Sequence, residues 1–288
     1  MGDAEIQEEF DRRVKAIIEN ILRQERQLIE ESRGLLDQAR SDIVARMAEG
    51  GHTEWDAYWL RQVRAAVERR LEHLKRDLET SLNQGINRAF DLGNELVSDP
   101  VRAALGVNQP IGISREIVQV ATQFSASLIT DVTTSAQAAI DGVLQRAALG
   151  SVTVQTSIAE IGRSLDDPKI FRSIAARAET IFRTEFLRMQ SIATQARMRS
   201  DAEAMRRAGW ALGKRWLPPP LTKRSRLSHF AAMGQERALD DPFEVGGEEL
   251  MFPRDPAGSA GNTINCRCVS QPTMKRIFKL DRDRKFER

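Results

Sequence analysis

Both cysteines of this 288-residue chain lie near its C-terminal end, in the run Asn265-Cys-Arg-Cys268. A cysteine thiolate is both a nucleophile and a metal ligand. Because Val269 follows and Pro272 comes soon after, we expect the cysteines on a short strand that Pro272 ends. Alternate residues of a strand point to the same side. The spacing therefore predicts that the two thiols share either a metal ion or one pocket of the core.

His229 is a third candidate zinc ligand beside Cys266 and Cys268. Structural zinc sites take four protein ligands, and Asp255 is the nearest candidate for the fourth. The spacing matches no closed zinc module, and reduced cysteines also pack as small hydrophobic side chains. We favour the interpretation of reduced, packed cysteines over that of a zinc site. We therefore expect no cofactor, no stoichiometric zinc, and a melting temperature that a chelator leaves unchanged.

Glu185 falls on the apolar face of a predicted helix, between Phe182 and Met189. A buried carboxylate needs a partner, and Arg226 or His229 could supply one. A Glu–His pair could act in acid–base catalysis, but an ion pair that ties the helix to a sheet is the interpretation we favour. The chain shows no Ser-His-Asp order, no phosphate loop and no paired catalytic carboxylates. We therefore expect no catalytic residues and no enzymatic activity.

A cluster of basic residues surrounds the run Leu217-Pro-Pro-Pro-Leu221, and it includes Lys214, Arg215, Lys223 and Arg224. These side chains could contact DNA phosphates. They could also form a solvated loop or a docking edge for an acidic partner, which we favour. The formal net charge of the whole chain is only +2, which is too small to indicate a nucleic-acid-binding protein.

The composition indicates a helix-rich chain of two domains. A length of 288 residues exceeds the usual size of one domain, and 11 phenylalanines with a single tyrosine suit long helices better than sheets. Two cysteines make no disulfide framework, so we expect a reducing compartment. There is no apolar leader and no apolar run long enough to span a membrane, so we expect a soluble protein with no membrane association.

Two long amphipathic helices are predicted, from about Ile6 to Met47 and from about Thr53 to Leu96. The short Gly-Gly-His link between them predicts an antiparallel hairpin over residues 4–97, with Thr53 capping the second helix. The buried stripes are predicted from the spacing of apolar residues. They are Phe10, Val14, Ile17, Ile21, Leu28 and Leu35 in the first helix, and Trp55, Trp59, Val63, Val67, Leu71, Leu74, Leu78, Leu82, Ile86 and Phe90 in the second.

A loop over residues 98–113 and further helices over 114–161 complete the predicted N-terminal part. Ser114 is expected to cap the third helix, with its inward face formed by Ile117, Val120, Phe124, Leu128, Val132, Ala139 and Val143. The aromatic group of Trp55, Tyr58 and Trp59 is interpreted as a packed cluster, with a partner-docking patch as the alternative.

Asp166-Asp167-Pro168 is a helix start signal, and the helix that it opens is expected to end at Gly209. Beyond Gly209, short apolar runs between Pro and Gly clusters predict strands at 209–217, 243–245, 250–252 and 264–269, with a short helix near 225–233. The predicted fold class is therefore α+β and predominantly α. The predicted domains are a helical domain at 1–166, an α+β domain at 167–274 and a basic tail at 275–288.

An ordered set of short motifs runs through the C-terminal part. It consists of Arg183-Thr-Glu185, Gly209-Trp, Lys214-Arg-Trp216, Ser225-Arg226-x-x-His229, Pro242-Phe-x-Val-Gly246, Pro253-Arg-Asp-Pro and Asn265-Cys-Arg-Cys268. In this order the motifs resemble the phage Mu F-like minor head proteins of the head morphogenesis family, over roughly residues 170–272. The pattern departs from that family at Thr222, where an acidic residue is usual.

The resemblance implies a structural signature and a role in virus assembly. The signature residues are Arg183, Glu185, Trp216, Arg226, His229, Asp255, Asn265, Cys266 and Cys268. The implied role is that of a minor capsid protein of a tailed phage or prophage, which joins the portal protein and the scaffold or major capsid protein in the host cytoplasm. It would then stay in the virion, inside the head near the portal. Two other roles remain open: a packaged DNA-binding or ejection protein, and a toxin-like enzyme of the same domain family. The sequence leaves the oligomeric state open.

Overall fold

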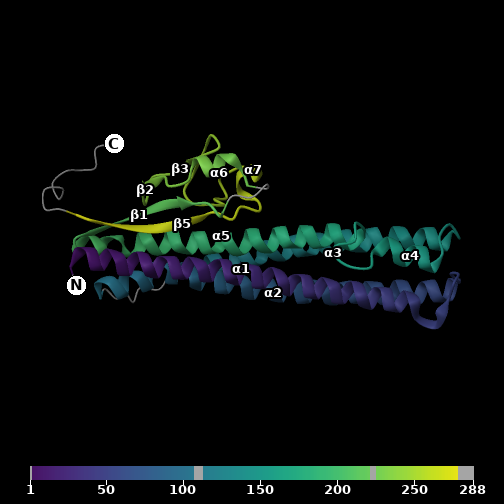
Figure 1. The fold of residues 1–288 in the computed structure, drawn as a ribbon. Coiled ribbons are helices and arrows are strands. Elements are labelled where there is room, and N and C mark those ends of the chain that lie inside the picture. Colours follow the sequence, from purple (N-terminus) through teal and green to yellow (C-terminus); the bar gives the residue numbers. More distant parts are fainter. Residues whose placement is uncertain (1, 107–112, 221–224, 278–288) are drawn as a thin grey trace. The chain divides into compact units, whose positions relative to one another are not determined.

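The structure is a computed structural model that describes residues 2–106, 113–220 and 225–277. Its helices are α1 (Asp3–Ala48), α2 (Ala57–Leu105), α3 (Glu116–Ala148), α4 (Val154–Ile161), α5 (Ile170–Arg207), α6 (Leu227–Ala231) and α7 (Ala260–Thr263), with a 3-10 turn η1 at Glu49–Gly51 (Figure 1). Its strands are β1 (Trp210–Leu217), β2 (Glu236–Ala238), β3 (Phe243–Val245), β4 (Glu248–Leu250) and β5 (Val269–Arg276). The predicted fold class, α+β and predominantly α, is confirmed. No helix in the described part of the chain has the length and apolar character needed to cross a membrane.

The strands form two small antiparallel sheets. One has the order β2-β1-β5, and the other pairs β3 with β4. β1 and β5 pair along their whole length, from Trp210 opposite Arg276 to Leu217 opposite Val269. The strand predicted at 264–269 is therefore wrong: β5 begins only at Val269 and continues through Pro272. A proline is tolerated there because β5 is an edge strand. The two cysteines lie in the connection between α7 and β5.

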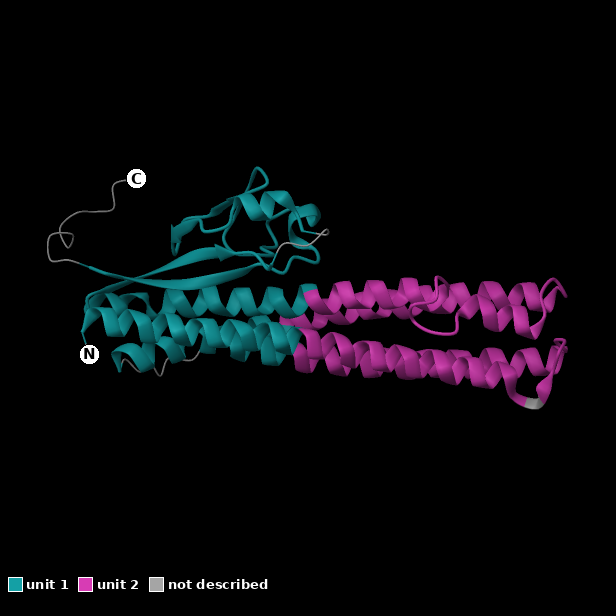
Figure 2. Ribbon diagram, viewed as in Figure 1, with its two compact units in different colours: residues 1–25, 86–119, 184–288 teal, residues 26–85, 120–183 magenta. Residues whose placement is uncertain are grey.

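The chain divides into two compact units, shown in Figure 2. Unit 1 contains residues 1–25, 86–119 and 184–288, and unit 2 contains residues 26–85 and 120–183. Each unit combines segments that are far apart in the sequence. The domain boundary expected after residue 166, at the start signal of the helix that precedes the strands, stays a prediction.

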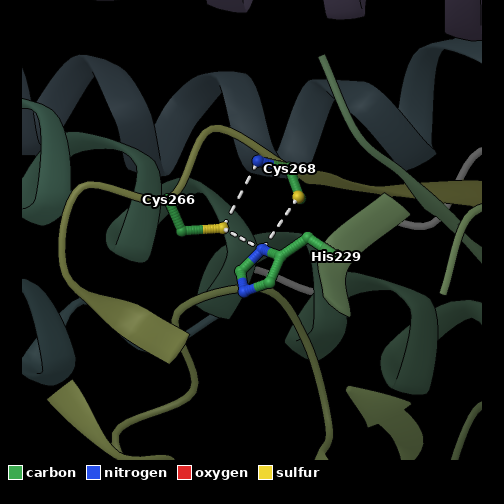
Figure 3. Close-up of side chains that lie close together, drawn as sticks. All are labelled: His229, Cys266 and Cys268. Carbon is green, nitrogen blue, oxygen red and sulfur yellow. Dashed lines mark hydrogen bonds between the residues drawn. The ribbon is translucent and has the colours of Figure 1, made fainter. Parts of the chain in front are cut away.

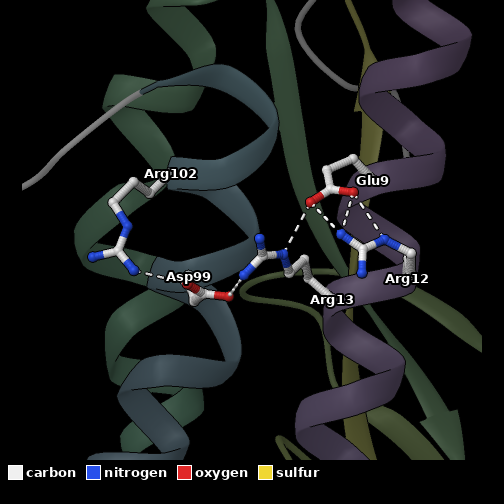
Figure 4. A network of polar contacts seen from close by, with 5 residues as sticks. All are labelled: Glu9, Arg12, Arg13, Asp99 and Arg102. Carbon is white, nitrogen blue, oxygen red and sulfur yellow. Dashed lines mark hydrogen bonds and ion pairs between the residues drawn. The ribbon is translucent and has the colours of Figure 1, made fainter.

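In unit 1 the beginning of α1 runs antiparallel to the end of α2. The Arg13 guanidinium joins the two helices, because it bonds the Asp99 carboxylate of α2 at 3.1 Å and the Glu9 carboxylate of its own helix at 2.9 Å (Figure 4). Arg12 and Arg102 extend this network at either end. These side chains are partly exposed, so the network contributes little stability. Burial of apolar side chains such as Phe10 stabilises the contact more.

In unit 2 the rest of α1 and α2 continues as an antiparallel pair, tied by Arg70 and Asp42 at 2.6 Å. The hairpin predicted from the short link is therefore present in both units. The predicted stripes are buried except at Trp55, which lies before α2 and is half-buried, and at Leu35, which is half-buried whereas Leu36 is fully buried. A straight helix has 3.6 residues per turn, so a stripe spaced by seven residues drifts around the helix. The drift transfers the buried position from Leu35 to Leu36.

The ends of α2 differ from the sequence-based prediction. α2 begins at Ala57, and its cap is Asp56, whose Oδ1 accepts from the backbone N–H of Tyr58 and of Trp59, at 2.9 and 2.7 Å. Thr53 does not cap it. At its other end α2 continues through Pro100 to Leu105, where a loop was predicted. Pro100 removes one helical hydrogen bond, but buried apolar residues on both sides of it, Val97 and Val101, pack the helix in place.

The predicted inward face of α3 is wrong at its N-terminal half. Ile117, Val120 and Phe124 are exposed, as is Ala139 further along, whereas Val132 and Val143 are buried as predicted. The actual buried face includes the small polar residues Ser125 and Thr133, which a search for apolar spacing passes over. The Thr133 hydroxyl donates to the Ile129 carbonyl at 3.2 Å, which satisfies it inside the packed face. The expected face was therefore rotated away from the true one.

The aromatic residues at the start of α2 divide between core and surface. Trp59 is buried, its ring lies 4.9 Å from that of His52, and the Arg46 guanidinium lies 4.5 Å from its centroid. Tyr58 is exposed. The packed-cluster interpretation holds for Trp59, and a docking role for Tyr58 stays open as a hypothesis.

Helices α2 and α5 approach each other closely at Gly93, in unit 1. A Cβ atom built at Gly93 would lie 2.5 Å from the Gln190 carbonyl oxygen and 2.7 Å from the Ala193 Cβ. The Gly93 carbonyl also accepts a hydrogen bond of 3.0 Å from the Thr194 hydroxyl. This position therefore needs a glycine for packing rather than for backbone freedom.

We expect Gly93→Ala to destabilise the protein by about 1–3 kcal/mol, because the added methyl group meets rigid helix backbone. The matched control is Gly34→Ala in α1, where an added Cβ meets nothing within 4 Å. That substitution should stabilise by about 1 kcal/mol through helix propensity. Urea unfolding followed by circular dichroism measures both. Equal effects of the two variants would contradict the close contact.

Candidate functional site

The imidazole of His229, in α6, faces both cysteine sulfurs, as Figure 3 shows. Its Nδ1 atom is 3.3 Å from the Cys268 Sγ and 3.5 Å from the Cys266 Sγ. The three potential ligand atoms all lie within 4.8 Å of one another, and all three residues are buried. The prediction that the two thiols lie together on one side of the chain is therefore confirmed, although the connection to β5, and not a strand, brings them together.

Asn262 of α7 fixes the other side of the imidazole. Its Oδ1 lies 3.4 Å from the His229 Nε2, and its Nδ2 donates to the Val245 carbonyl at 3.2 Å. Because the amide nitrogen is committed to a carbonyl, the amide oxygen faces the ring and accepts from an Nε2–H. This tautomer leaves the Nδ1 lone pair directed at the sulfurs. Asn262 was not among the predicted site residues, and only its position three residues before Asn265 hinted at a role.

The site is built into the hydrophobic core of the α+β part. Trp216 of β1 contacts the imidazole edge-on, with ring centroids 5.7 Å apart, and contacts Phe243 of β3 in the same manner at 5.4 Å. The core cluster consists of Trp216, Ala232, Phe243, Val245, Leu250, Cys266 and Cys268. The cysteines therefore share one pocket of the core, which is one of the two arrangements that their spacing predicted.

Arg254 supports the cysteine segment from behind and was missing from the predicted site residues. It is fully buried, and its Nη1 donates to the carbonyls of Cys266 and Cys268, at 2.9 and 2.7 Å. Its Nη2 donates to the Ser191 hydroxyl of α5 at 2.7 Å. Its backbone is left-handed, with φ of 67°, which is unfavourable for a residue other than glycine. Its place inside the motif Pro253-Arg-Asp-Pro was the one sequence signal for it.

The two thiols differ in their affinity for a proton. The hydrogen bond with Cys268, aided by His229 and Arg254, holds the pKa of Cys266 well below its usual range despite burial. The neighbouring Cys266 sulfur and burial raise the pKa of Cys268. In the described part of the chain no carboxylate lies within ion-pair distance of Arg254. The Cys266 sulfur, 3.8 Å from Arg254 Nη1, is therefore the anionic group that suits this buried cation.

Glu185 lies in the same region, but its partner is not the predicted one. Its carboxylate accepts from Arg188, one turn along α5, at 2.7 Å. Burial raises the pKa of Glu185, and Arg188 opposes that effect. Arg188 in turn donates to the Arg254 carbonyl at 3.4 Å. The predicted pairing with Arg226 or His229 is wrong, because Arg226 donates to the Ile264 carbonyl at 2.7 Å and His229 faces the cysteines.

Two of the three remaining predicted residues shape the chain around the site. The Asp255 carboxylate accepts from the backbone N–H groups of Met251 and Ala257, at 2.8 and 3.0 Å, so it organises its loop and is not the fourth zinc ligand expected from the sequence. Asn265 has a left-handed backbone with φ of 58°, which an asparagine tolerates, and it turns the chain from α7 into the cysteines. Arg183 is buried in α5 and belongs to unit 2.

The predicted basic surface does not hold for Lys214. Alternate residues of β1 face the core, and Lys214 shares that face with Trp216, so it is fully buried. Its Nζ donates to the carbonyls of Leu239 and Met251, at 3.1 and 2.8 Å. Arg215 points the other way and pairs with Glu236. Lys223 and Arg224 lie outside the described residues, as does most of the predicted tail 275–288.

Burial lowers the pKa of Lys214 to about 8 from its ordinary 10.5, with the positive charge of Arg199 adding to the effect. The folded chain therefore loses this proton before the unfolded chain does. Below pH 8 the buried charge destabilises the fold, and this penalty disappears as the pH rises toward 10.5. The free energy of unfolding of the natural protein should rise over this range by up to about 3 kcal/mol relative to Lys214→Met. Denaturant titrations of both proteins from pH 7 to pH 10.5 test this, and a constant difference would contradict it.

Arg254→Lys should destabilise the protein by about 2–4 kcal/mol, because a single ammonium cannot reach both cysteine carbonyls and the Ser191 hydroxyl. Arg215→Lys is the matched control. Its pair with Glu236 is partly exposed, so the free energy of unfolding should change by less than about 1 kcal/mol. If both variants unfolded at the same urea concentration, the supporting role of Arg254 would be wrong.

Comparison with known proteins adds one partial likeness. The chain is 31% identical over 137 residues to the "Uncharacterized protein YqbB" of Bacillus subtilis (strain 168), a match that covers 46% of this chain and 42% of that protein. The matched region thus spans less than half the length of that relative. No family model matches the chain, and no solved structure matches it.

Proposed function

We propose that this chain is a minor head protein of a tailed phage or prophage, which binds the portal protein and the capsid interior during procapsid assembly. The observation that carries the proposal is the placement of the signature residues. Motifs between residues 214 and 268 converge on one buried centre, formed by Trp216, His229, Arg254, Cys266 and Cys268. This arrangement supports the interpretation that the shared motifs define one fold unit.

The burial of these residues also supports a structural role over an enzymatic one. A catalytic centre must admit a substrate, yet His229 is only 4% exposed and each cysteine only 2%. Glu185, the other candidate for acid–base chemistry, is also buried and is neutralised by Arg188. The proposed role in assembly needs neither a cofactor nor a reaction.

A packaged DNA-binding role has less support. Of the residues considered for phosphate contact, Lys214 is buried and Arg215 is paired with Glu236. The proposed partner is therefore protein. The helices of unit 2 end in exposed apolar side chains, Tyr58 at the start of α2 and Leu149 after α3, which are suited to a protein contact. We assign the portal contact to these helical ends.

The proposal is tested by expressing the chain together with the portal protein of the same phage or prophage and isolating the portal through an affinity tag. We expect the chain to co-purify with the portal ring at a fixed ratio and to remain bound when nuclease removes DNA. The double variant Tyr58→Ser/Leu149→Ser should fold and lose the portal, since both side chains are exposed.

The matched control is Leu227→Ser/Met233→Ser, which alters two exposed apolar side chains beside α6 in unit 1 and should leave binding intact. Substitutions serve better than deletion of residues 1–97, because residues 1–25 and 86–97 belong to the same compact unit as the sheet. Loss of binding in the control alone would move the contact to the α+β part. Failure of the natural protein to bind any portal, together with salt-sensitive retention on DNA, would overturn the proposal in favour of the DNA-binding role.

A further inference from the structure

We propose that His229, Cys266 and Cys268 hold one zinc ion, which clamps α6 to the segment that leads into β5. The inference concerns the isolated chain and does not depend on the portal contact. It replaces the sequence-based expectation of packed, metal-free cysteines, because the structure supplies what the spacing alone lacked: three convergent ligand atoms in one buried place.

The distances fit a tetrahedral ion. Zinc lies about 2.3 Å from a thiolate sulfur and about 2.0 Å from an imidazole nitrogen, so a sulfur and a nitrogen on one ion lie about 3.5 Å apart. The two Nδ1–Sγ distances of this site are 3.3 and 3.5 Å. The two sulfurs lie within 4.8 Å of each other, and they need about 3.8 Å on one ion, which small rotations of the two cysteine side chains provide without a change of the backbone.

The surroundings of the imidazole suit a metal ligand. A histidine that binds a metal through one nitrogen usually donates its other N–H to a fixed oxygen, which sets the tautomer. Asn262 provides that oxygen, and its own orientation is fixed by the Val245 carbonyl. The lone pair of Nδ1 is therefore held toward the two sulfurs before any ion arrives.

The surroundings of Cys266 suit a thiolate, which is the form that binds zinc. Two N–H donors point at its sulfur: the backbone N–H of Cys268 at 3.4 Å and the Arg254 guanidinium at 3.8 Å. Arg254 also holds the carbonyls on both sides of Arg267, so the cysteine segment is fixed in shape. Two thiolates and one imidazole form a soft ligand set that selects zinc over calcium or magnesium.

Three protein ligands leave one position of the tetrahedron for a small molecule such as water. Within the described residues no further His, Cys, Asp or Glu joins the group. We nevertheless assign this zinc site a structural role, because it is buried and joins two segments that no disulfide joins. In a reducing compartment a metal is the cross-link that such a pair of thiols can form.

Cobalt substitution tests the proposal directly. The full-length protein is freed of metal under reducing conditions and titrated with Co²⁺, which should give sulfur-to-cobalt charge-transfer absorption and intense visible bands that saturate at one equivalent. The chain has only 2 cysteines, so thiolate-to-cobalt absorption can arise only from Cys266 and Cys268. Zinc should displace the cobalt, and the protein purified without chelators should contain one zinc per chain.

Variants locate the ligands. Cys266→Ser/Cys268→Ser should abolish the charge-transfer absorption, and His229→Gln should weaken binding, whereas the matched control His73→Gln on the exposed face of α2 should bind as the natural protein does. Asn262→Ala should bind cobalt with about 10–100-fold lower affinity at unchanged stoichiometry. The spectrum of the natural protein decides the question even where a variant fails to fold. Absence of charge-transfer absorption in the folded natural protein, or metal retained by the double cysteine variant, would overturn the proposal.

Discussion

The buried guanidinium of Arg254 is the interaction on which the α+β part depends. It reaches the carbonyls of both cysteines and the Ser191 hydroxyl of α5, so one side chain joins a helix to the segment that starts β5. A buried charge is tolerated when hydrogen bonds replace its hydration, and here two bonds go to main-chain carbonyls and one to a hydroxyl, while the Nε–H lacks a partner among the described residues. The residue also accepts a left-handed backbone. A glycine would relieve that strain but would remove every one of these contacts, which is why an arginine fits this strained position.

Helix α5 connects the site around Arg254 to the other helices of unit 1. One side of its C-terminal half meets α2 at Gly93, where the two backbones nearly touch. Its other side chains reach the strand region, through Thr184 to the Asn265 N–H at 2.9 Å and through Gln195 to the Leu239 carbonyl at 2.6 Å. The small sheets are therefore not independent of the long helices. Within unit 1 the sheets and the helices form one packed body, and α5 contacts both.

The sequence predicted the fold class, the two long antiparallel helices and the common pocket of the two cysteines, because each depends on local periodicity or close spacing. The approach of His229, which lies 37 residues before Cys266, was only the less favoured alternative. It misplaced what depends on tertiary contacts. The helical period assigned the wrong face of α3, since buried Ser125 and Thr133 carry no apolar signal. Charge counting assigned Lys214 to the surface, although the alternation of β1 carries it into the core. Glu185 was correctly placed inside, but its partner was sought in a distant motif when Arg188 lay one helical turn away. Arg254 and Asn262 were not recognised, because only the folded chain brings them to the site.

Pro272 in β5 has a consequence for how this protein meets others. β5 forms one margin of the three-stranded sheet, and a proline there presents no N–H to an incoming strand. At the opposite margin β2 is only three residues long. Neither side offers a row of donors and acceptors long enough to template a further strand, so the sheet is closed to growth by strand addition. Many copies of such a chain can be concentrated in a confined space without joining edge to edge. Association is thereby left to helix surfaces and exposed side chains, where specificity can be set residue by residue.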